Sequence, residues 1–241
     1  MNSESIVRRY EDFELELDPE RADSSENVIV QYGFPGSGST YMWQVLNAIF
    51  PGAKKTHNCP SYSEAVRVVA TVRDFRDVLC TYLGRANLPA NRDSIDFLIN
   101  LHASDARSFR DLYRVSEVWG DRQNILWLRY EDFFGNFDYL ITRIEEFFGV
   151  SVPEEKRRAI EAEYSLDANL RRTAQADALC QKDGAKGWLD RDWRPFTVDG
   201  INGLHITGNG AVGKWKRIIP EELHDYVTDL LAAPLKQYGY L

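Results

Sequence analysis

The residues best suited to chemistry form a turn rich in glycine and hydroxyl groups at positions 33–41, Gly-Phe-Pro-Gly-Ser-Gly-Ser-Thr-Tyr. An apolar run at 28–30 precedes this turn, which predicts a strand over 28–32 and a helix over about 38–49. The first turn of a helix offers unpaired N–H groups and the positive end of the helix dipole. The pattern therefore predicts a cradle for phosphate or sulfate. The alternative is an ordinary tight turn.

The turn has the outline of a Walker A loop without its charge. Ser39 stands where that motif carries its lysine, so the turn indicates an anion but not the reaction. A P-loop kinase for a small molecule, dependent on Mg²⁺ and a nucleotide, is one alternative. Arg73 argues against it, because this cation occupies a strand end where an acidic metal ligand is expected.

A second segment with chemical potential is Lys54-Lys55-Thr56-His57. If the sheet is parallel, this segment lies near the same cleft as the turn. A histidine with a pKa near neutrality accepts a proton from an attacking hydroxyl, and a neighbouring lysine offsets charge on a transferring group. Taken alone, His57 is better explained as an ordinary surface or packed histidine.

A third candidate is Arg73, which follows a strand predicted over 66–72. The last five residues of this strand are uncharged, as expected for a strand buried on both faces. Thr81 lies about two turns along the next helix, predicted over 74–83, so it shares an anion with Arg73 only if that helix folds back. The alternative is a surface ion pair between Arg73 and Asp77.

Two later segments complete the set of candidates. Leu128-Arg129-Tyr130-Glu131-Asp132 ends a strand predicted over 124–128, and its alternative role is a helix-capping acid. The segment at 208–216, Gly-Asn-Gly-Ala-Val-Gly-Lys-Trp-Lys, combines glycines that allow close backbone approach with two lysines. Its alternative is a flexible surface loop.

The remaining pattern predicts the elements that position these residues. Helices are expected over 93–119, 137–148 and 153–163, and a last helix begins at Pro220 and ends at Pro234. Residues 164–210 show no clear period and predict an irregular, substrate-covering region. Strands that alternate with helices predict an α/β fold with three layers, in which a mostly parallel sheet has helices on both faces.

Composition limits the class of protein. The chain has 241 residues, 44% of them hydrophobic, which predicts a packed core; we expect a leader or edge strand over 1–26 and a single domain over 27–241. A net charge of −8 disfavours binding to nucleic acid or to an anionic membrane surface. No apolar run has transmembrane length, and no signal-peptide pattern opens the chain. Three scattered cysteines fit a reducing compartment, which predicts a cytoplasmic location.

The order of these segments is more specific than any one of them. From about residue 28 to 217 the chain resembles the sulfotransferases that use 3′-phosphoadenosine 5′-phosphosulfate (PAPS), a family with a fold like that of the P-loop NTPases. The resemblance rests on the loop at 35–41, Lys55-Thr56-His57, Arg73 with Thr81, Tyr130-Glu131-Asp132 and Gly213-Lys214-Trp215-Lys216. It implies transfer of a sulfuryl group to a hydroxyl or amine of a small-molecule acceptor. The second alternative is a degenerate protein that only binds the cofactor.

The resemblance implies a role for each loop residue and for the catalytic pair. The residues that would hold the 5′-phosphosulfate are Gly36, Ser37, Gly38, Ser39 and Thr40. His57 would be the general base toward the acceptor, and Lys55 would assist charge stabilisation.

The resemblance also implies where the rest of the cofactor binds. Tyr41, where the family usually has tryptophan, would stack on the adenine, and Tyr130 would lie near it. Arg73 and Thr81 would bind the 3′-phosphate, with threonine in place of the family's serine. Gly210 is also expected to contact the cofactor.

Two departures from the family pattern concern positive charge. The family's loop lysine is Gly36 here, and its Arg-Lys-Gly element is Gly-Asn-Gly at 208–210. The basic residues considered as replacements are Lys214, Lys216, Lys55 and Arg76.

Overall fold

The computed structural model describes residues 28–34, 36–57, 66–100, 122–181 and 210–241, together with two short strands at Val7–Arg8 and Phe196–Thr197. The rest of the leader predicted over 1–26, the second part of the helix predicted over 93–119, and Gly208 and Asn209 lie outside these residues.

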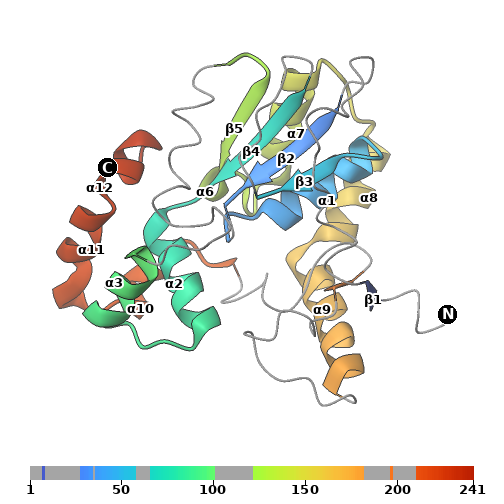
Figure 1. The fold of residues 1–241 in the computed structure, drawn as a ribbon. Helices are drawn as coiled ribbons and strands as arrows, with labels where there is room; N and C mark the ends of the chain where they lie inside the picture. The colour runs from blue at the N-terminus through green and yellow to red at the C-terminus, as the bar shows by residue number, and fades with distance from the viewer. Residues whose placement is uncertain are drawn as a thin grey trace, which may run out of the picture.

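Four parallel strands form the central sheet, in the order β3-β2-β4-β5 (Figure 1). They are β2 (Ile29–Gly33), β3 (Lys54–Thr56), β4 (Arg67–Val72) and β5 (Ile125–Arg129). A separate antiparallel pair joins β1 (Val7–Arg8) to β6 (Phe196–Thr197). The predicted parallel sheet is confirmed. Strand β3 was not predicted as a strand, because its Lys-Lys-Thr sequence has no apolar residue.

The helices are α1 (Ser39–Ile49), α2 (Phe75–Ala86), α3 (Arg92–Asn100), α6 (Tyr130–Phe133), α7 (Phe137–Phe148), α8 (Glu154–Tyr164), α9 (Leu166–Gln181), α10 (Trp215–Ile218), the 3₁₀ turn η5 (Glu221–Leu223), α11 (His224–Leu230) and α12 (Ala232–Gln237). Helices α1, α2, α7 and α8 confirm the helices predicted at these places, and α7 has the predicted bounds. Gly149 caps α7 in the left-handed conformation that favours glycine.

Two apolar cores lie on opposite faces of the sheet, which gives the predicted three layers. Alternate β4 residues divide between them: Val68, Ala70 and Val72 join the core with α2, α3 and the C-terminal helices, and Val69 joins the core with α1, α7 and α8. Figure 1 shows these two groups of helices on either side of the strands. Strand β4 is buried on both faces, so packing on either side fixes the position of its carboxyl end. Arg73 directly follows this end of the strand.

Helix α9 corrects the prediction of an irregular region from residue 164 onward. Among the α9 side chains that the structure describes, the buried ones are small or polar, namely Ala168, Asn169 and Thr173, so their burial leaves no apolar period in the sequence. Asn169 and Gln44 of α1 exchange two amide hydrogen bonds, of 3.1 Å and 3.3 Å. A polar contact therefore holds α9 on α1. The prediction of helices from apolar periodicity does not detect such a contact.

The C-terminal segment corrects a second prediction. The single helix expected from Pro220 to Pro234 is instead η5, α11 and α12, and Pro234 lies inside α12. A new helix, α12, begins at Ala232, so Pro234 lies in its first turn. The N–H groups of a first turn make no intrahelical hydrogen bond, and a proline is tolerated there.

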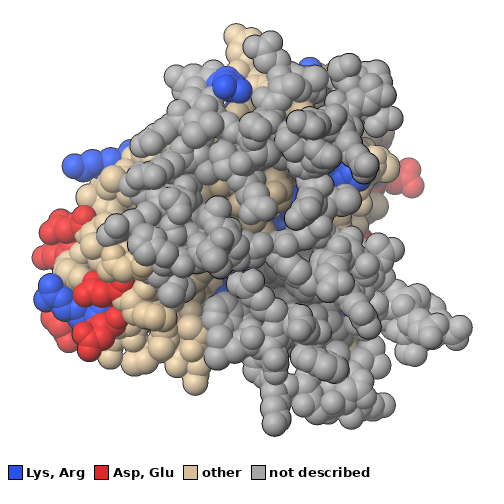
Figure 2. All heavy atoms as spheres, viewed as in Figure 1, with Lys and Arg blue, Asp and Glu red and all other residues tan. Residues whose placement is uncertain are grey.

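The surface charge is mixed on the part of the molecule where it can be followed. Acidic and basic side chains lie interspersed on the side that carries α3 and α11 (Figure 2). This mixture provides no extended patch of one sign on that side.

Candidate functional site

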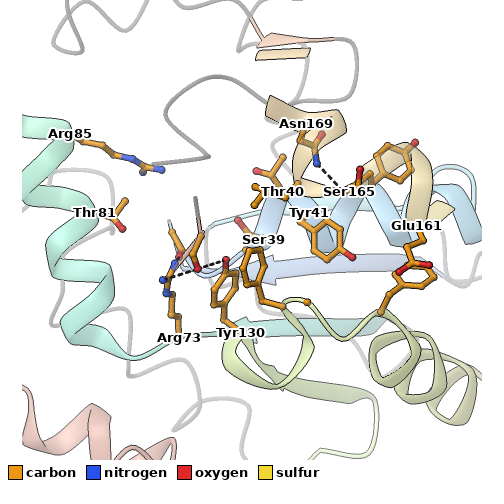
Figure 3. Close-up of a pocket in the computed structure, with 18 residues that line it drawn as sticks. Ser39, Thr40, Tyr41, Arg73, Thr81, Arg85, Tyr130, Glu161, Ser165 and Asn169 are labelled. Atoms are coloured by element: carbon orange, nitrogen blue, oxygen red, sulfur yellow. Dashed lines mark hydrogen bonds between the residues drawn. The ribbon is translucent and has the colours of Figure 1, made fainter. Parts of the chain in front are cut away.

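A cavity of about 360 Å³ opens where the carboxyl ends of β2 and β4 meet the N-terminus of α1. Nine of the twelve predicted site residues line it: Gly36, Gly38, Ser39, Thr40, Tyr41, Arg73, Thr81, Tyr130 and Gly210. Figure 3 shows Arg73, Thr81 and Arg85 on one side of the cavity and Tyr41, Glu161 and Asn169 on the other. The structure therefore brings residues from six segments of the chain around one space.

The N-terminus of α1 forms one wall of the cavity. Gly38 is the N-cap residue, and among the described residues no side chain caps this end. The first intrahelical bond runs from Met42 N–H to the Gly38 carbonyl oxygen, 3.0 Å, so the N–H groups of Ser39, Thr40 and Tyr41 precede the helical ladder. No acidic residue occupies the first turn. This end of the helix can accept an anion.

Ser37 is the loop residue that lies outside the cavity lining. Its side chain is fully buried, and its hydroxyl lies 2.7 Å from the Phe34 carbonyl oxygen and 2.9 Å from the Thr71 hydroxyl. Its N–H donates to the same Phe34 carbonyl at 3.0 Å. Ser37 thus shapes the loop from beneath, with both of its donor groups engaged by the protein.

Gly38 allows the loop to approach Tyr130 closely. Its φ is +79°, and a Cβ atom at this position would lie 2.7 Å from the Tyr130 ring. Gly210 lies against the hydroxyl of the same residue, since a Cβ atom at this position would lie 2.4 Å from the Tyr130 hydroxyl oxygen. A side chain at either position would displace Tyr130 from the cavity wall.

Arg73 is the buried cation of the site, with 4% of its surface exposed. Its guanidinium pairs with Asp77 at 3.1 Å and donates to the carbonyl oxygens of Gly36, at 3.3 Å, and Ala211, at 2.5 Å. The predicted alternative, a pair with Asp77, exists, but it is buried rather than at the surface. The Arg73 Nε atom is buried and has no hydrogen-bond partner among the described residues. A buried donor of this kind is expected to meet a ligand.

Tyr130 supports Arg73 and closes the cavity. The Arg73 guanidinium carbon lies 4.2 Å from the centre of the Tyr130 ring, a cation–π contact. The Tyr130 hydroxyl donates to the Gly210 carbonyl oxygen at 2.9 Å. Burial raises the pKa of Tyr130, so this hydroxyl stays protonated and works as a donor.

Tyr41 supplies an aromatic surface to the other half of the cavity. Its ring stacks on Phe133 with centres 6.3 Å apart and an angle of 18° between planes. Burial, with a smaller effect from the Glu161 carboxylate, raises the pKa of Tyr41 to about 12. The ring is neutral and is suited to stacking on a flat ligand.

Lys55 and His57 reach the loop from β3 without lining the cavity. The Lys55 ammonium donates to the Thr40 hydroxyl at 2.7 Å, and His57 Nδ1 lies 2.6 Å from the Gly33 carbonyl oxygen. Since a carbonyl oxygen only accepts, neutral His57 carries its hydrogen on Nδ1 and its lone pair on Nε2. This tautomer suits a base that takes a proton through Nε2.

Two cations in or next to the cavity were not assigned from the sequence: Arg85 is a lining residue, whereas Lys214 only contacts one. Arg85 lines the cavity one turn beyond Thr81 on α2, and the Lys214 ammonium donates to the Thr81 hydroxyl at 2.6 Å. The spacing of four residues between Thr81 and Arg85 was a readable signal, because such residues share a helix face. Lys214 was considered only as a replacement cation, since nothing in the sequence places it beside α2.

At the opposite end of the cavity, Tyr164 and Asn169 fall within the 164–210 region predicted to cover the substrate, whereas Glu161 was not predicted to line the site. Glu161 and Tyr164 of α8 and Asn169 of α9 line it there. The signal available in the sequence was weak, because these residues belong to helices with few large apolar side chains.

Comparison with known proteins places the chain in a family. The family model for the sulfotransferase domain matches residues 50–239. The chain therefore belongs to the sulfotransferase family, whose activity is sulfuryl transfer, and the predicted resemblance is confirmed. The kinase alternative is not favoured. The matched span begins after the loop at 36–41, so the assignment of that loop rests on its own geometry.

Solved structures share the fold at low sequence identity. Mouse sulfotransferase SULT7A1, complexed with PAP, is 17% identical, with a TM-score of 0.59 over 87% of this chain and 84% of that one. Retinol dehydratase with androsterone and inactive cofactor PAP is 15% identical, with a TM-score of 0.63 over 87% and 81% of the two chains. A second retinol dehydratase structure, with retinol and PAP, gives 16% identity, a TM-score of 0.60 and the same coverage. These matches confirm the predicted fold class.

Two further comparisons concern close relatives and membranes. No curated protein sequence matches the chain. Within the described residues, none of the helices combines the length and apolar character needed to cross a membrane.

Proposed function

We propose that this sulfotransferase uses the cavity to bind PAPS and transfers its sulfuryl group to a hydroxyl or amine of a small-molecule acceptor. One observation carries the proposal: a single cavity joins an uncapped helix N-terminus to the buried Arg73 and to aromatic walls. PAPS presents the matching groups, since it has a phosphosulfate, a separate phosphate and a flat adenine. The PAP in the similar structures supports the same ligand class.

Each part of the cavity is assigned to one part of the donor. The N–H groups of residues 39–41 face the 5′-phosphosulfate. The Arg73 Nε faces the 3′-phosphate, and the Thr81 hydroxyl joins it by turning its hydrogen from the Asp77 carbonyl oxygen to the ligand. The rings of Tyr41 and Tyr130 flank the adenine, and Gly210 leaves room beside it. Ser37, which was predicted to bind the donor directly, instead holds the loop in shape.

The protein's contribution to catalysis is proton transfer and charge stabilisation around the loop. When bound, PAPS supplies an electrophilic sulfuryl group attached to a phosphate oxygen that leaves. His57 Nε2 takes the proton of the acceptor, while its Nδ1–H stays on the Gly33 carbonyl oxygen and fixes the ring. Lys55 stabilises developing negative charge through its position on Thr40.

The loop itself provides no side-chain cation. Gly36 stands where the resemblance expects lysine, so Lys55 and the α1 N-terminus are the positive groups at the leaving phosphate. Because charge accumulates there in the transition state, we expect turnover slower than with a loop lysine.

The proposal extends to organisation and setting. We propose one domain over 27–241, because both cores combine residues from early and late segments. We also retain the cytoplasmic location, without nucleic acid as a partner. A buried free Cys80, whose pKa burial raises to about 12, supports ordinary unreactive thiols.

Incubation with PAPS labelled in its sulfuryl group and a panel of hydroxyl and amine acceptors tests the activity. We expect transfer of label to at least one acceptor. In a parallel thermal-shift assay, PAP at 100 times its Kd stabilises the fold by about 2.7 kcal/mol, whereas ATP with Mg²⁺ does not. A shift with ATP and Mg²⁺ but none with PAP contradicts the proposal.

A further inference from the structure

We propose that Lys214 binds the donor and completes, with Arg73 and Thr81, the subsite for its 3′-phosphate. This inference rests on the proposed function. The resemblance expects Arg-Lys-Gly at 208–210, where this chain has Gly-Asn-Gly, so positive charge is missing from the place where the sequence pattern expects it. The positions of the four candidate replacements decide which one supplies it.

Lys214 does not itself line the cavity, but from a buried position it contacts Thr81, which does. Only 4% of its surface is exposed, and its ammonium donates to the Thr81 hydroxyl at 2.6 Å. Thr81 lines the cavity and donates its own hydrogen to the Asp77 carbonyl oxygen at 3.1 Å. Among the described residues this is the one hydrogen bond of the Lys214 ammonium, so two of its three N–H groups remain for a ligand.

The charge around Lys214 is unbalanced. The Asp77 carboxylate is taken by Arg73 and by the N–H groups of Gly213 and Trp215, at 2.8 Å and 3.0 Å. Among the described residues Lys214 forms no ion pair, and Arg85 adds another cation to the same wall. A buried ammonium without a carboxylate is costly, and a bound dianion removes that cost.

The electrostatic surroundings agree with this imbalance. Burial, with the nearby Arg73, lowers the pKa of Lys214 to about 8. An anion beside it restores the charged form. The hydrogen bonds from Gly213 and Trp215 to Asp77 fix the segment against α2, so the ammonium is positioned before a ligand arrives.

The other candidates are placed for different contacts. Arg76 pairs with Asp74 at 2.7 Å and lies over the Trp215 ring at 4.2 Å. Lys216 is exposed, and its ammonium lies 5.7 Å from the centre of the Trp215 ring. Lys55 is bonded to Thr40 at the loop end of the cavity. Of the four, Lys214 is the one whose side chain bonds to Thr81 among the described residues.

Calorimetric binding of two ligands separates the 3′-phosphate from the rest of the donor. PAP carries both the 3′- and 5′-phosphates, and AMP carries only the 5′-phosphate. For Lys214→Met we expect about 10- to 100-fold weaker binding of PAP and less than about 3-fold change for AMP. The matched control, Lys216→Met, removes a lysine two residues away and leaves both affinities unchanged.

The outcomes distinguish the two proposals. If the wild type binds PAP and Lys214→Met binds it equally well, the role of Lys214 is wrong and the proposed function stands. An equal loss for PAP and AMP also overturns the 3′-phosphate assignment. A wild type that binds no PAP overturns the proposed function and this inference with it.

A pH titration of the wild type covers the case in which Lys214→Met does not fold. The groups facing the Lys214 ammonium are Arg73, Asp77, Cys80, Thr81 and Arg85. We expect the ratio of PAP to AMP affinity to fall about tenfold between pH 7 and pH 9.5, as the amine loses its proton. A constant ratio contradicts the inference.

Discussion

The two ends of the cavity bind anions by different physical means. At the loop end, the N–H groups of residues 39–41 provide partial positive charge, and Gly36 contributes no side chain. At the other end, Arg73, Arg85 and Lys214 provide full charges, and Asp77 holds part of them in place. Backbone dipoles therefore follow from local sequence, whereas the charged wall depends on tertiary contacts between β4, α2 and the 213–215 segment.

The greatest loss of activity should follow removal of the proposed base, His57, at the loop end. His57→Ala should lower turnover about 10²- to 10⁴-fold, because no side chain then takes the acceptor proton. PAP affinity should stay within about 3-fold of wild type, since the proposed role of His57 is toward the acceptor and its Nδ1 contacts the Gly33 carbonyl oxygen. Steady-state kinetics with calorimetry measures both. Unchanged turnover removes the general-base assignment.

A large loss of stability should follow removal of the Asp77 carboxylate, which binds Arg73 and the backbone of the 213–215 segment at the charged end. Asp77→Asn removes the carboxylate that pairs with the buried Arg73 and lies near the buried Lys214, so we expect a loss of about 3–5 kcal/mol in the free energy of unfolding. Glu154→Gln is the control, because it breaks an exposed pair with Arg158 and should cost less than about 1 kcal/mol. Urea unfolding compares them. Equal losses in the two variants count against a buried charged wall.

A smaller loss of stability should follow a substitution at Gly38, in the backbone of the loop. Gly38→Ala adds a Cβ atom 2.7 Å from the Tyr130 ring at a φ of +79°, so we expect about 2–3 kcal/mol of destabilisation and at least about tenfold weaker PAP binding. Gly52→Ala has a φ of +94° with open space around the Cβ, so it should cost about 1 kcal/mol and leave binding unchanged. Similar PAP affinities in the two variants contradict the close-approach argument.

The smallest effect is a pH dependence at the charged end. The folded state lowers the pKa of Lys214 from 10.5 to about 8, so between these values the unfolded chain binds more protons than the folded one. The contribution of Lys214 to the free energy of unfolding therefore rises with pH across this window. Denaturation of the wild type and Lys214→Met at pH 7.5, 8.5 and 9.5 measures it. We expect the free energy of unfolding of the wild type, relative to that of Lys214→Met, to increase as the pH rises. A constant or decreasing difference contradicts this prediction.

The same contrast explains how much of the molecule the sequence predicted. Helices α1 and α7, the parallel sheet and the loop follow from apolar period, glycines and cap residues, which act over a few positions. Strand β3 and helix α9 were missed because one contains only polar residues and the other buries small and polar ones.

The candidate site shows the same division. Arg73 and Thr81 were identified through the order of motifs, and both line the cavity. Lys214 and Arg85 were not assigned, because a hydrogen bond between residues 133 positions apart, such as that from Lys214 to Thr81, leaves no local signature. The family resemblance implied that Ser37 contacts the phosphosulfate, yet its hydroxyl bonds inward to Phe34 and Thr71.

A crystal structure of the protein with PAP bound locates both phosphates at once and so decides whether the two anion subsites are assigned correctly. We predict one phosphate within about 2.7–3.2 Å of the first-turn N–H groups of α1. The other phosphate should lie within the same distance of the Lys214 ammonium and the Arg73 guanidinium. A 3′-phosphate that contacts neither Lys214 nor Arg73 would contradict the account.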